Sequence, residues 1–287
     1  MAEGDFDLNG YKMGLGYDVV VESFDPGSAE WITQDAVAPV GGRRNFGADY
    51  ASGPTWVLDL ATDTHDAASA RAALAGAARA WRPSGLATPG YEAILKYTIG
   101  GETRRVYGRP RKFAPIANGV SASGVMLATA EFVTSEAFTH AEEARSLTVG
   151  LVPVESGGFT SPLISPITTV AGSQRQGLID DVGGDAPAPM TITIQGPVSG
   201  PKVSSSGWYF SLPSLSLAYD QSVTIDTRKG TVRRNDGANL GGLLSRGSTR
   251  LVDARLKTGA VEFIYSGTDQ TATSTATVTW RPTYHAL

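Results

Sequence analysis

The 287-residue sequence contains no cysteine. This absence excludes thiol nucleophiles, thiolate metal sites and any disulfide framework. Long apolar runs are also missing, since no segment approaches the ~20 residues that a membrane span requires. Residues 1–5 have neither the basic flank nor the apolar stretch of a signal peptide. We therefore expect a soluble chain that is not exported by a visible signal and has no membrane partner.

Charge is scarce and slightly negative. Charged residues make up 18 % of the chain, and the net charge is -4, so bulk electrostatics would repel a phosphate backbone. We expect no sequence-specific binding to nucleic acid. Glycine (34 residues) and proline (16) are abundant, together above their usual ~12 % share. This composition predicts a turn-rich chain with little helix.

The first half mixes strands with one helix. Short β-branched runs at residues 18–22 and 56–60 predict strands. Between them, residues 25–52 show no sustained period and predict a long loop or arm. A helix is predicted over residues 64–82, with N-cap oxygens at residues 62–64 and Pro83 as the stop signal. Its predicted buried face, which should pack on a sheet, consists of Ala70, Leu74, Ala77 and Trp81.

The sequence after the helix predicts a β-hairpin and then a domain boundary. Residues 91–99 and 102–108 flank Gly100 and Gly101, which can adopt the positive φ values of a primed hairpin turn. Residues 147–152 predict a strand that closes the first half. Residues 156–174 carry no charge and are interrupted by two prolines, which is typical of an extended linker. We place the domain boundary there.

The second half has the pattern of a β-sandwich. Short alternating runs recur at 190–194, 222–226 and 261–265, and the run at 271–280 places threonine at every odd position opposite a largely apolar face. Several such strands without a convincing helix predict a jelly-roll or lectin-like sandwich. The fold class is therefore mainly β, with a β domain over residues 1–155, a linker over 156–186 and a β-sandwich over 187–287.

Catalytic motifs are weak. His65, His140 and His285 are far apart in sequence, and none has a second metal ligand at helical or hairpin spacing. No G-x-S-x-G motif is present, and the pair Gly14 and Gly16 lacks the third glycine and following helix of a dinucleotide site. A turn is the simpler interpretation of this pair. We predict no catalytic, cofactor-binding or metal-binding residues, and no cofactor.

Carboxylates offer two weaker alternatives. Asp180, Asp181 and Asp185 could supply oxygens to calcium, but they lack the spacing of a known calcium loop, and a solvated loop is favoured. A second set on predicted strands could in principle supply the pair of acids that a glycosidase needs, although the sequence cannot pair its members. This set consists of Asp59, Asp226 and Glu262.

Two further segments have a binding and a structural interpretation. Arg104, Arg105, Arg109, Arg111 and Lys112 form the strongest local charge feature, which we interpret as a subunit interface or edge protection in preference to a nucleic-acid groove. The second segment could stack on a sugar, but an aromatic run within a strand is more often core. It consists of Trp208 and Tyr209 beside Phe210.

The second half also resembles a known family in five segments between Met190 and Tyr284. In order and spacing they are similar to the distal tail proteins, or minor tail proteins, of long-tailed, non-contractile bacteriophages, particularly the actinobacterial phage type. The segments are Gly196-Pro197 with Pro201, residues 215–221, residues 223–228, residues 236–239 and residues 279–284.

This resemblance implies a non-enzymatic virion component at the tail tip, assembled in the host cytoplasm. The first domain would form a homo-hexameric ring, with a galectin-like domain outside it. The implied partners are the tail tube, hub, tape measure and receptor-binding or fibre proteins. A carbohydrate-binding module or adhesin is the alternative function, followed by a glycoside hydrolase.

Overall fold

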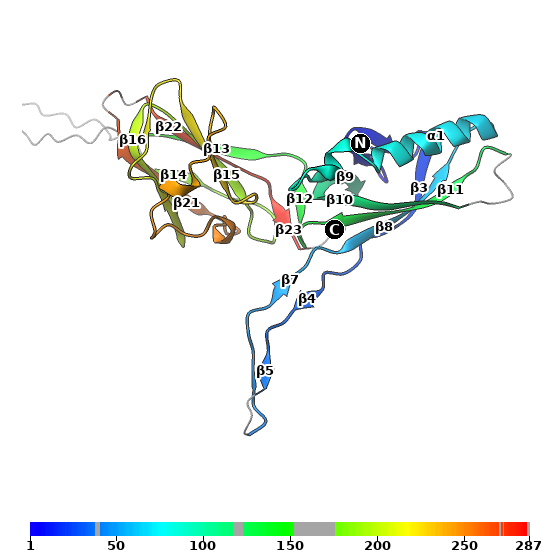
Figure 1. Cartoon of the computed structure of the whole chain (residues 1–287), viewed down its shortest axis with the longest axis horizontal. Coiled ribbons are helices and arrows are strands. Elements are labelled where there is room, and N and C mark those ends of the chain that lie inside the picture. The colour runs from blue at the N-terminus through cyan, green and yellow to red at the C-terminus, as the bar shows by residue number, and fades with distance from the viewer. Residues whose placement is uncertain (38–40, 117–122, 152–175, 270, 272, 286–287) are drawn as a thin grey trace, which may run out of the picture. The chain divides into compact units, whose positions relative to one another are not determined.

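The chain consists of two compact units in a computed structural model that describes residues 1–287 except 38–40, 117–122, 152–175, 270, 272 and 286–287 (Figure 1). Unit 1 comprises Met1–Glu142 and Tyr284–Leu287, and unit 2 comprises Glu143–Thr283. This division falls before residue 155, where the first domain was expected to end. The expected linker over residues 156–174 lies outside the described residues and stays a prediction.

Unit 1 is built on one sheet with the strand order β2-β1-β9-β10-β11-β8-β3, to which β12 adds beside β10 and β23 adds beside β12. Its buried face carries large apolar side chains such as Trp56, Leu95 and Phe132. The strands are β1 (Phe6–Leu8), β2 (Tyr11–Met13), β3 (Val19–Asp25), β8 (Thr55–Thr62), β9 (Ala93–Ile99), β10 (Glu102–Ile116), β11 (Leu127–Thr134), β12 (Thr139–Ala141) and β23 (Thr283–Tyr284).

The predicted hairpin is confirmed. Ile99 of β9 pairs with Glu102 of β10 across Gly100 and Gly101, whose φ values are 65° and 78°. Two successive positive φ angles define the type I′ turn, which only glycine adopts without strain at both positions. The carboxylate of Glu3 accepts hydrogen bonds from both glycine N–H groups, at 2.8 and 3.0 Å, and these bonds lower its pKa.

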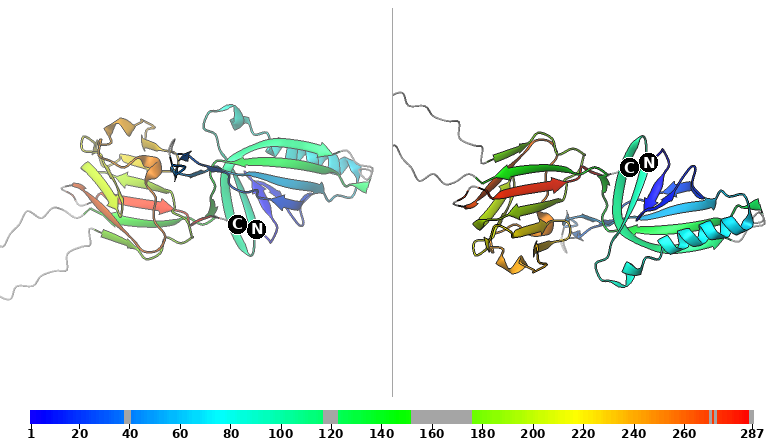
Figure 2. Two further views of the ribbon diagram at one scale, coloured as in Figure 1. Left: turned by 90° about the horizontal axis from the view of Figure 1, so that it is seen from below. Right: turned by 90° about the horizontal axis from the view of Figure 1, so that it is seen from above.

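The helix is shorter than predicted. Helix α1 covers Ala67–Ala80 and lies along one face of the sheet (Figure 2). Its N-cap is Asp66, whose carboxylate accepts hydrogen bonds from the N–H groups of Ala68 (2.8 Å) and Ser69 (2.9 Å). The N-cap oxygens expected at residues 62–64 are not used, because an aspartate closer to the alanine run satisfies the free N–H groups.

The predicted buried face of α1 is largely confirmed. Ala70, Ala77 and Trp81 are at most 1 % exposed, and Ala73 is also buried. Leu74 is only half-buried. Trp81 follows the last helical residue, and its indole N–H donates to the carbonyl oxygen of Glu131 at 3.1 Å. Trp81 is therefore the main large anchor between the helix and the sheet.

Residues 25–52 form a β-structured arm between β3 and β8 (Figure 1). We call these residues, which the structure describes apart from 38–40, the arm; they were expected to be a long loop or arm. Two short antiparallel ladders hold its two sides together, and each ladder contains two residue pairs. The arm strands are β4 (Trp31–Ile32), β5 (Ala36–Val37), β6 (Arg44–Asn45) and β7 (Tyr50–Ala51).

Unit 2 is a β-sandwich of two five-stranded sheets, as the alternating sequence predicts. The first sheet has the order β13-β22-β15-β19-β20, and the second has β14-β21-β16-β17 with β18 beside β16. A single apolar cluster fills the space between them. The strands are β13 (Arg145–Gly150), β14 (Gln176–Ile179), β15 (Met190–Gln195), β16 (Val198–Ser205), β17 (Trp208–Ser211), β18 (Ser216–Leu217), β19 (Ser222–Asp226), β20 (Thr231–Arg234), β21 (Val261–Thr268) and β22 (Thr275–Trp280).

The strand expected to close the first half belongs to the second. Strand β13 pairs along its whole length with β22, from Arg145 opposite Trp280 to Gly150 opposite Thr275. The side chain of Val149 is buried in the core of unit 2. Alternation predicted the strand, but it carries no information on the partner, so its assignment to the first domain was wrong.

Trp81 provides a test of the helix packing. We expect Trp81→Ala to lower the free energy of unfolding of unit 1 by about 3–5 kcal/mol, because the change leaves a cavity and an unpaired carbonyl. Arg71→Ala, on the exposed side of the same helix, should change it by less than about 0.5 kcal/mol. Denaturant unfolding followed by circular dichroism measures both. Equal effects would contradict the assigned face.

The extent of unit 2 gives a second prediction. A fragment of residues 143–283 should unfold cooperatively on its own, because it contains every strand of both sheets. A fragment of residues 187–287 lacks β13 and β14, and should therefore bind a hydrophobic dye and melt without a sharp transition. Calorimetry on the two fragments measures this difference. Equal cooperativity would show that β13 and β14 do not belong to the folding unit.

Candidate interaction surface

The arm exposes an unusual amount of apolar surface. Five of its large side chains are more than half exposed: Trp31 (65 %), Ile32 (57 %), Val37 (61 %), Phe46 (81 %) and Tyr50 (57 %). A ribbon of two ladders with two pairs each cannot bury such side chains within itself, and an isolated hairpin is only marginally stable in water. Clusters of exposed apolar side chains mark sites of protein contact.

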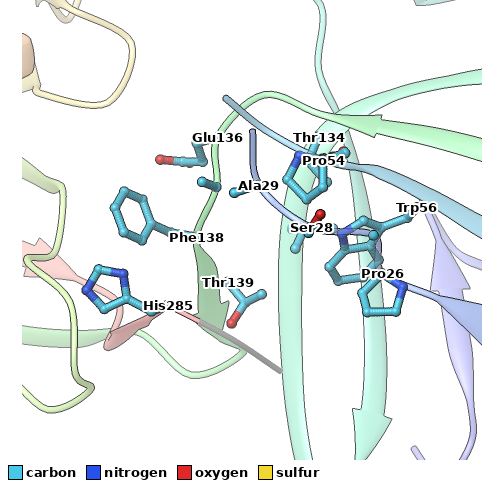
Figure 3. A pocket seen from close by; sticks show the side chains of 13 residues that line it. Pro26, Ser28, Ala29, Pro54, Trp56, Thr134, Glu136, Phe138, Thr139 and His285 are labelled. Atoms are coloured by element: carbon cyan, nitrogen blue, oxygen red, sulfur yellow. Dashed lines mark hydrogen bonds between the residues drawn. The ribbon is translucent and has the colours of Figure 1, made fainter. Parts of the chain in front are cut away.

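A cavity of about 340 Å³ lies in unit 1 at the base of the arm (Figure 3). The beginning of the arm, with Pro54 and Trp56 just after it, forms one side of the cavity, and the segment between β11 and β12 forms another. The lining is mainly apolar, with Glu136 as its carboxylate. It consists of Pro26, Gly27, Ser28, Ala29, Pro54, Trp56, Val106, Thr134, Glu136, Ala137, Phe138, Thr139 and His285.

Local contacts hold these walls in place. The N–H and the hydroxyl of Thr134 both donate to the carbonyl oxygen of Pro54, at 3.1 and 2.8 Å. Gly53 allows this approach, because a Cβ at this position would lie 2.4 Å from the Thr134 carbonyl oxygen. The rings of Phe138 and His285 meet edge to face, 5.2 Å apart. Backbone hydrogen bonds and a ring contact therefore fix the shape of the cavity at this end of the sheet.

The three histidines do not converge on one site. His65 is exposed, and His285 lines the cavity. His140 is buried, with its Nε2 3.1 Å from the Glu136 carboxylate and its ring 5.4 Å from that of Tyr107. In the part of the chain that the structure describes, no three His, Asp or Glu side chains are grouped so that they could hold a metal ion.

The structure separates the three carboxylates that were considered for a glycosidase pair. Asp59 lies in unit 1 and accepts hydrogen bonds from the hydroxyls of Ser23 (2.7 Å) and Thr129 (3.0 Å). Asp226 and Glu262 lie on different sheets of the unit 2 sandwich, each beside residues that face the core. Because the two sheets have their apolar faces together, these two acids point away from each other.

The acidic cluster around Asp180 is a solvated loop, as favoured. Asp180, Asp181 and Asp185 are exposed. The Asp181 carboxylate accepts a hydrogen bond from the N–H of Gly183 at 3.0 Å and lies 3.8 Å from the guanidinium of Arg145. Its charge therefore stabilises a turn.

Two structural interpretations are confirmed. Trp208 is only 5 % exposed, with its ring 5.3 Å from that of Phe210, so it belongs to the core. Tyr209 is half-buried outside this cluster, with the Lys202 ammonium 5.3 Å from its ring centre. Gly14 and Gly16 form the turn between β2 and β3, with φ values of 140° and 87°.

Among the described residues, no helix combines the length and apolar character that crossing a bilayer requires.

The basic run is largely paired within the chain. Strand β10 has β9, β11 and β12 beside it, so edge protection was the wrong interpretation. Arg104 pairs with Glu102 at 2.8 Å, and Arg105 pairs with Glu142 at 2.6 Å. Two other members also have partners: Lys112 pairs with Glu131 at 3.0 Å, and Arg109 donates to the carbonyl oxygens of Tyr91 (2.7 Å) and Thr88 (3.0 Å).

Glu142 receives two cations at the end of unit 1. Lys96 lies 3.2 Å from one carboxylate oxygen, and Arg105, which is 9 % exposed, contacts the other. Burial alone would raise the pKa of Glu142, but the hydrogen bonds from Arg105 and Lys96 outweigh this effect, and the pKa lies below its usual value. The folded state therefore favours the ionised carboxylate.

Sequence reasoning missed the cavity and the apolar character of the arm. The lining residues come from segments as distant as Pro26 and His285, and no spacing rule relates them. A signal for the arm was present, because Trp31, Phe46 and Tyr50 lie in a stretch that shows no strand or helix period. Large aromatic side chains in a segment without a period indicate a contact surface.

The Glu142 cluster predicts a specific pH response. A depressed pKa in the folded state contributes stability above the usual pKa of the group, and this contribution is lost as the pH falls through the folded-state value. Glu142→Gln should cost about 1–2 kcal/mol at pH 7 and flatten the loss of stability towards acid. The adjacent, exposed Glu143→Gln is the control and should follow the unmodified protein. Melting curves between pH 7 and pH 3 measure the effect, and parallel profiles for all three proteins would contradict it.

Comparison with known proteins places the fold. No family model matches the sequence, and no curated protein matches it. The structure is similar to the crystal structure of SPP1 Dit (gp 19.1), which is described as a paradigm of the hub adsorption apparatus in phages that infect Gram-positive bacteria. The TM-score of this match is 0.59 and the sequence identity is 10 %, and the match covers 97 % of this chain and 98 % of that chain. It is also similar to a chain of the phage P2 baseplate in its activated conformation with Ca, with a TM-score of 0.52, 10 % identity and 97 % coverage of both chains. The chain therefore has the mainly β fold found in these phage hub and baseplate structures.

Proposed function

We propose that this protein is a structural component of the tail tip of a long-tailed, non-contractile bacteriophage, with no catalytic role. In this proposal, six copies of unit 1 form a ring that joins the tail tube to the hub. Tape measure and receptor-binding or fibre proteins would be further partners. The protein would be assembled in the host cytoplasm and would function in the virion.

The observation that carries this proposal is the extent of the structural match. Likeness to SPP1 Dit covers 97 % of this chain and 98 % of that chain, so it includes both units. A shared fold alone does not fix function. Here the five segments between Met190 and Tyr284 indicate the same kind of protein independently of the fold.

The surface chemistry of unit 1 is consistent with such a role. Three of the five residues of the basic run pair with carboxylates within the chain, so much of the positive charge of the run is compensated before it reaches nucleic acid. The net charge of -4 acts in the same direction. A ring through which DNA passes must not retain it, and weak attraction to phosphate meets this requirement.

Ring formation also requires a particular type of contact. A closed ring of identical copies uses a heterologous interface, in which two different surfaces of each copy meet by rotation. Unit 1 offers an arm with uncovered apolar side chains and an apolar cavity. Both are in the unit that we assign to the ring.

The mass of the purified full-length protein tests the proposal. We expect light scattering to give a hexamer, and negative-stain micrographs to show rings with a central opening. A protein that stays monomeric at every concentration and binds defined sugars on a glycan array would contradict the proposal and favour a carbohydrate-binding module or adhesin.

A further inference from the structure

Phe46 is the most exposed of the large apolar side chains in the described residues, at 81 %. It lies on the returning side of the arm, directly after β6 and before Gly47. The two sides of the arm approach closely there, since a Cβ on Gly47 would lie 2.3 Å from the carbonyl oxygen of Gln34. Close backbone contact leaves no space for the ring between the two sides, so the ring projects away from the arm.

The cavity at the base of the arm has the properties of a receptor for such a ring. Its volume of about 340 Å³ is at the lower end of the range for ligand pockets, ~300–1,000 Å³. Trp56, Val106 and Phe138 give it an apolar lining. An aromatic side chain that fills such a pocket is the typical energetic centre of a protein interface.

The Phe46 of the same chain cannot occupy this cavity. Ala29 lines the cavity, whereas Phe46 lies next to Gly47, which is beside Gln34. Gln34 lies five positions after Ala29, a span of about 17 Å for an extended chain. The ladder between β4 and β7 lies within this stretch and prevents the arm from folding back. A Phe46 side chain that enters this cavity must therefore come from another copy.

Charge supports a second copy as the partner. Arg43 and Arg44 precede Phe46 closely in sequence and are exposed. Glu136 contributes a carboxylate to the cavity lining, and the exposed Asp25 immediately precedes Pro26 in the wall. A basic arm tip and an acidic cavity rim on the same chain complement each other between copies, and such complementarity fixes the register of an interface.

We propose that Phe46 of one copy inserts into the cavity formed by Pro26, Trp56, Val106 and Phe138 of the next copy, with Arg44 beside Glu136. This contact rests on the proposed ring and identifies two surfaces that close it. Arm and cavity are different surfaces of one unit, so each copy gives one contact and receives one, as a heterologous interface requires.

The cysteine-free sequence allows a direct test by cross-linking. Asn45→Cys places a thiol beside Phe46, and Ala137→Cys places one in the cavity lining. The two single variants, mixed and treated with a short bis-maleimide, should give a covalent heterodimer, and a chain carrying both changes should give a ladder of higher oligomers. Asn45→Cys mixed with Arg71→Cys, on the exposed side of α1, is the control and should give no specific product.

A second variant measures the contribution of the aromatic ring. Phe46→Ala should weaken self-association at least about tenfold, measured by sedimentation or light scattering over a concentration series. Tyr219→Ala, which removes an equally exposed ring (74 %) from unit 2, should leave association unchanged. Circular dichroism should be the same for both variants, because neither side chain is buried.

The outcomes separate this inference from the proposed function. Closed rings without the arm-to-cavity product, or rings unaffected by Phe46→Ala, would overturn the inference and leave the tail-tip role intact. A chain that is monomeric under all conditions and forms no cross-link would overturn both. The specific heterodimer together with weakened association of Phe46→Ala would establish the contact.

Discussion

The architecture of unit 1 depends on the backbone pairing of β10. This 15-residue strand has β9, β11 and β12 as neighbours, so it links most of the sheet. Proline cannot donate a ladder hydrogen bond and is normally excluded from such a strand. Pairing with β9 ends at Gly108, two residues before Pro110, and the ladder with β11 is irregular between Pro110 and Phe113. The strand therefore tolerates proline where one neighbour has already ended.

The pairing of this strand also explains why most of its basic residues have partners within the chain. A strand with neighbours on both sides brings its arginines close to acids from other segments, as Arg105 meets Glu142. Buried or half-buried cations require such partners, because an unpaired charge away from water is costly. Arg104 has a further contact with the Tyr284 ring, at 3.8 Å from its centre. The charges that dominate the local sequence thus stabilise the end of the sheet.

Local signals in the sequence predicted the elements well. The two glycines at 100 and 101, the threonine alternation before Trp280 and the alanine stripe of α1 all depend on neighbouring residues, and each predicted element exists. Pairing between distant strands was not accessible, because alternation indicates which face is buried and not which strand lies alongside. The partner of β13 and the lining of the cavity at Trp56 and His285 are both properties of the folded chain.

The pairing of β13 with β22 has a consequence for how such a chain can evolve. Arg145 lies opposite Trp280, so the first and last strands of unit 2 run side by side and its two ends leave the sandwich close together. A module with adjacent ends can be inserted into a host domain with little strain on the connections. Recombination can therefore exchange the whole of unit 2 for a module of different size, while the sheet of unit 1 keeps its register.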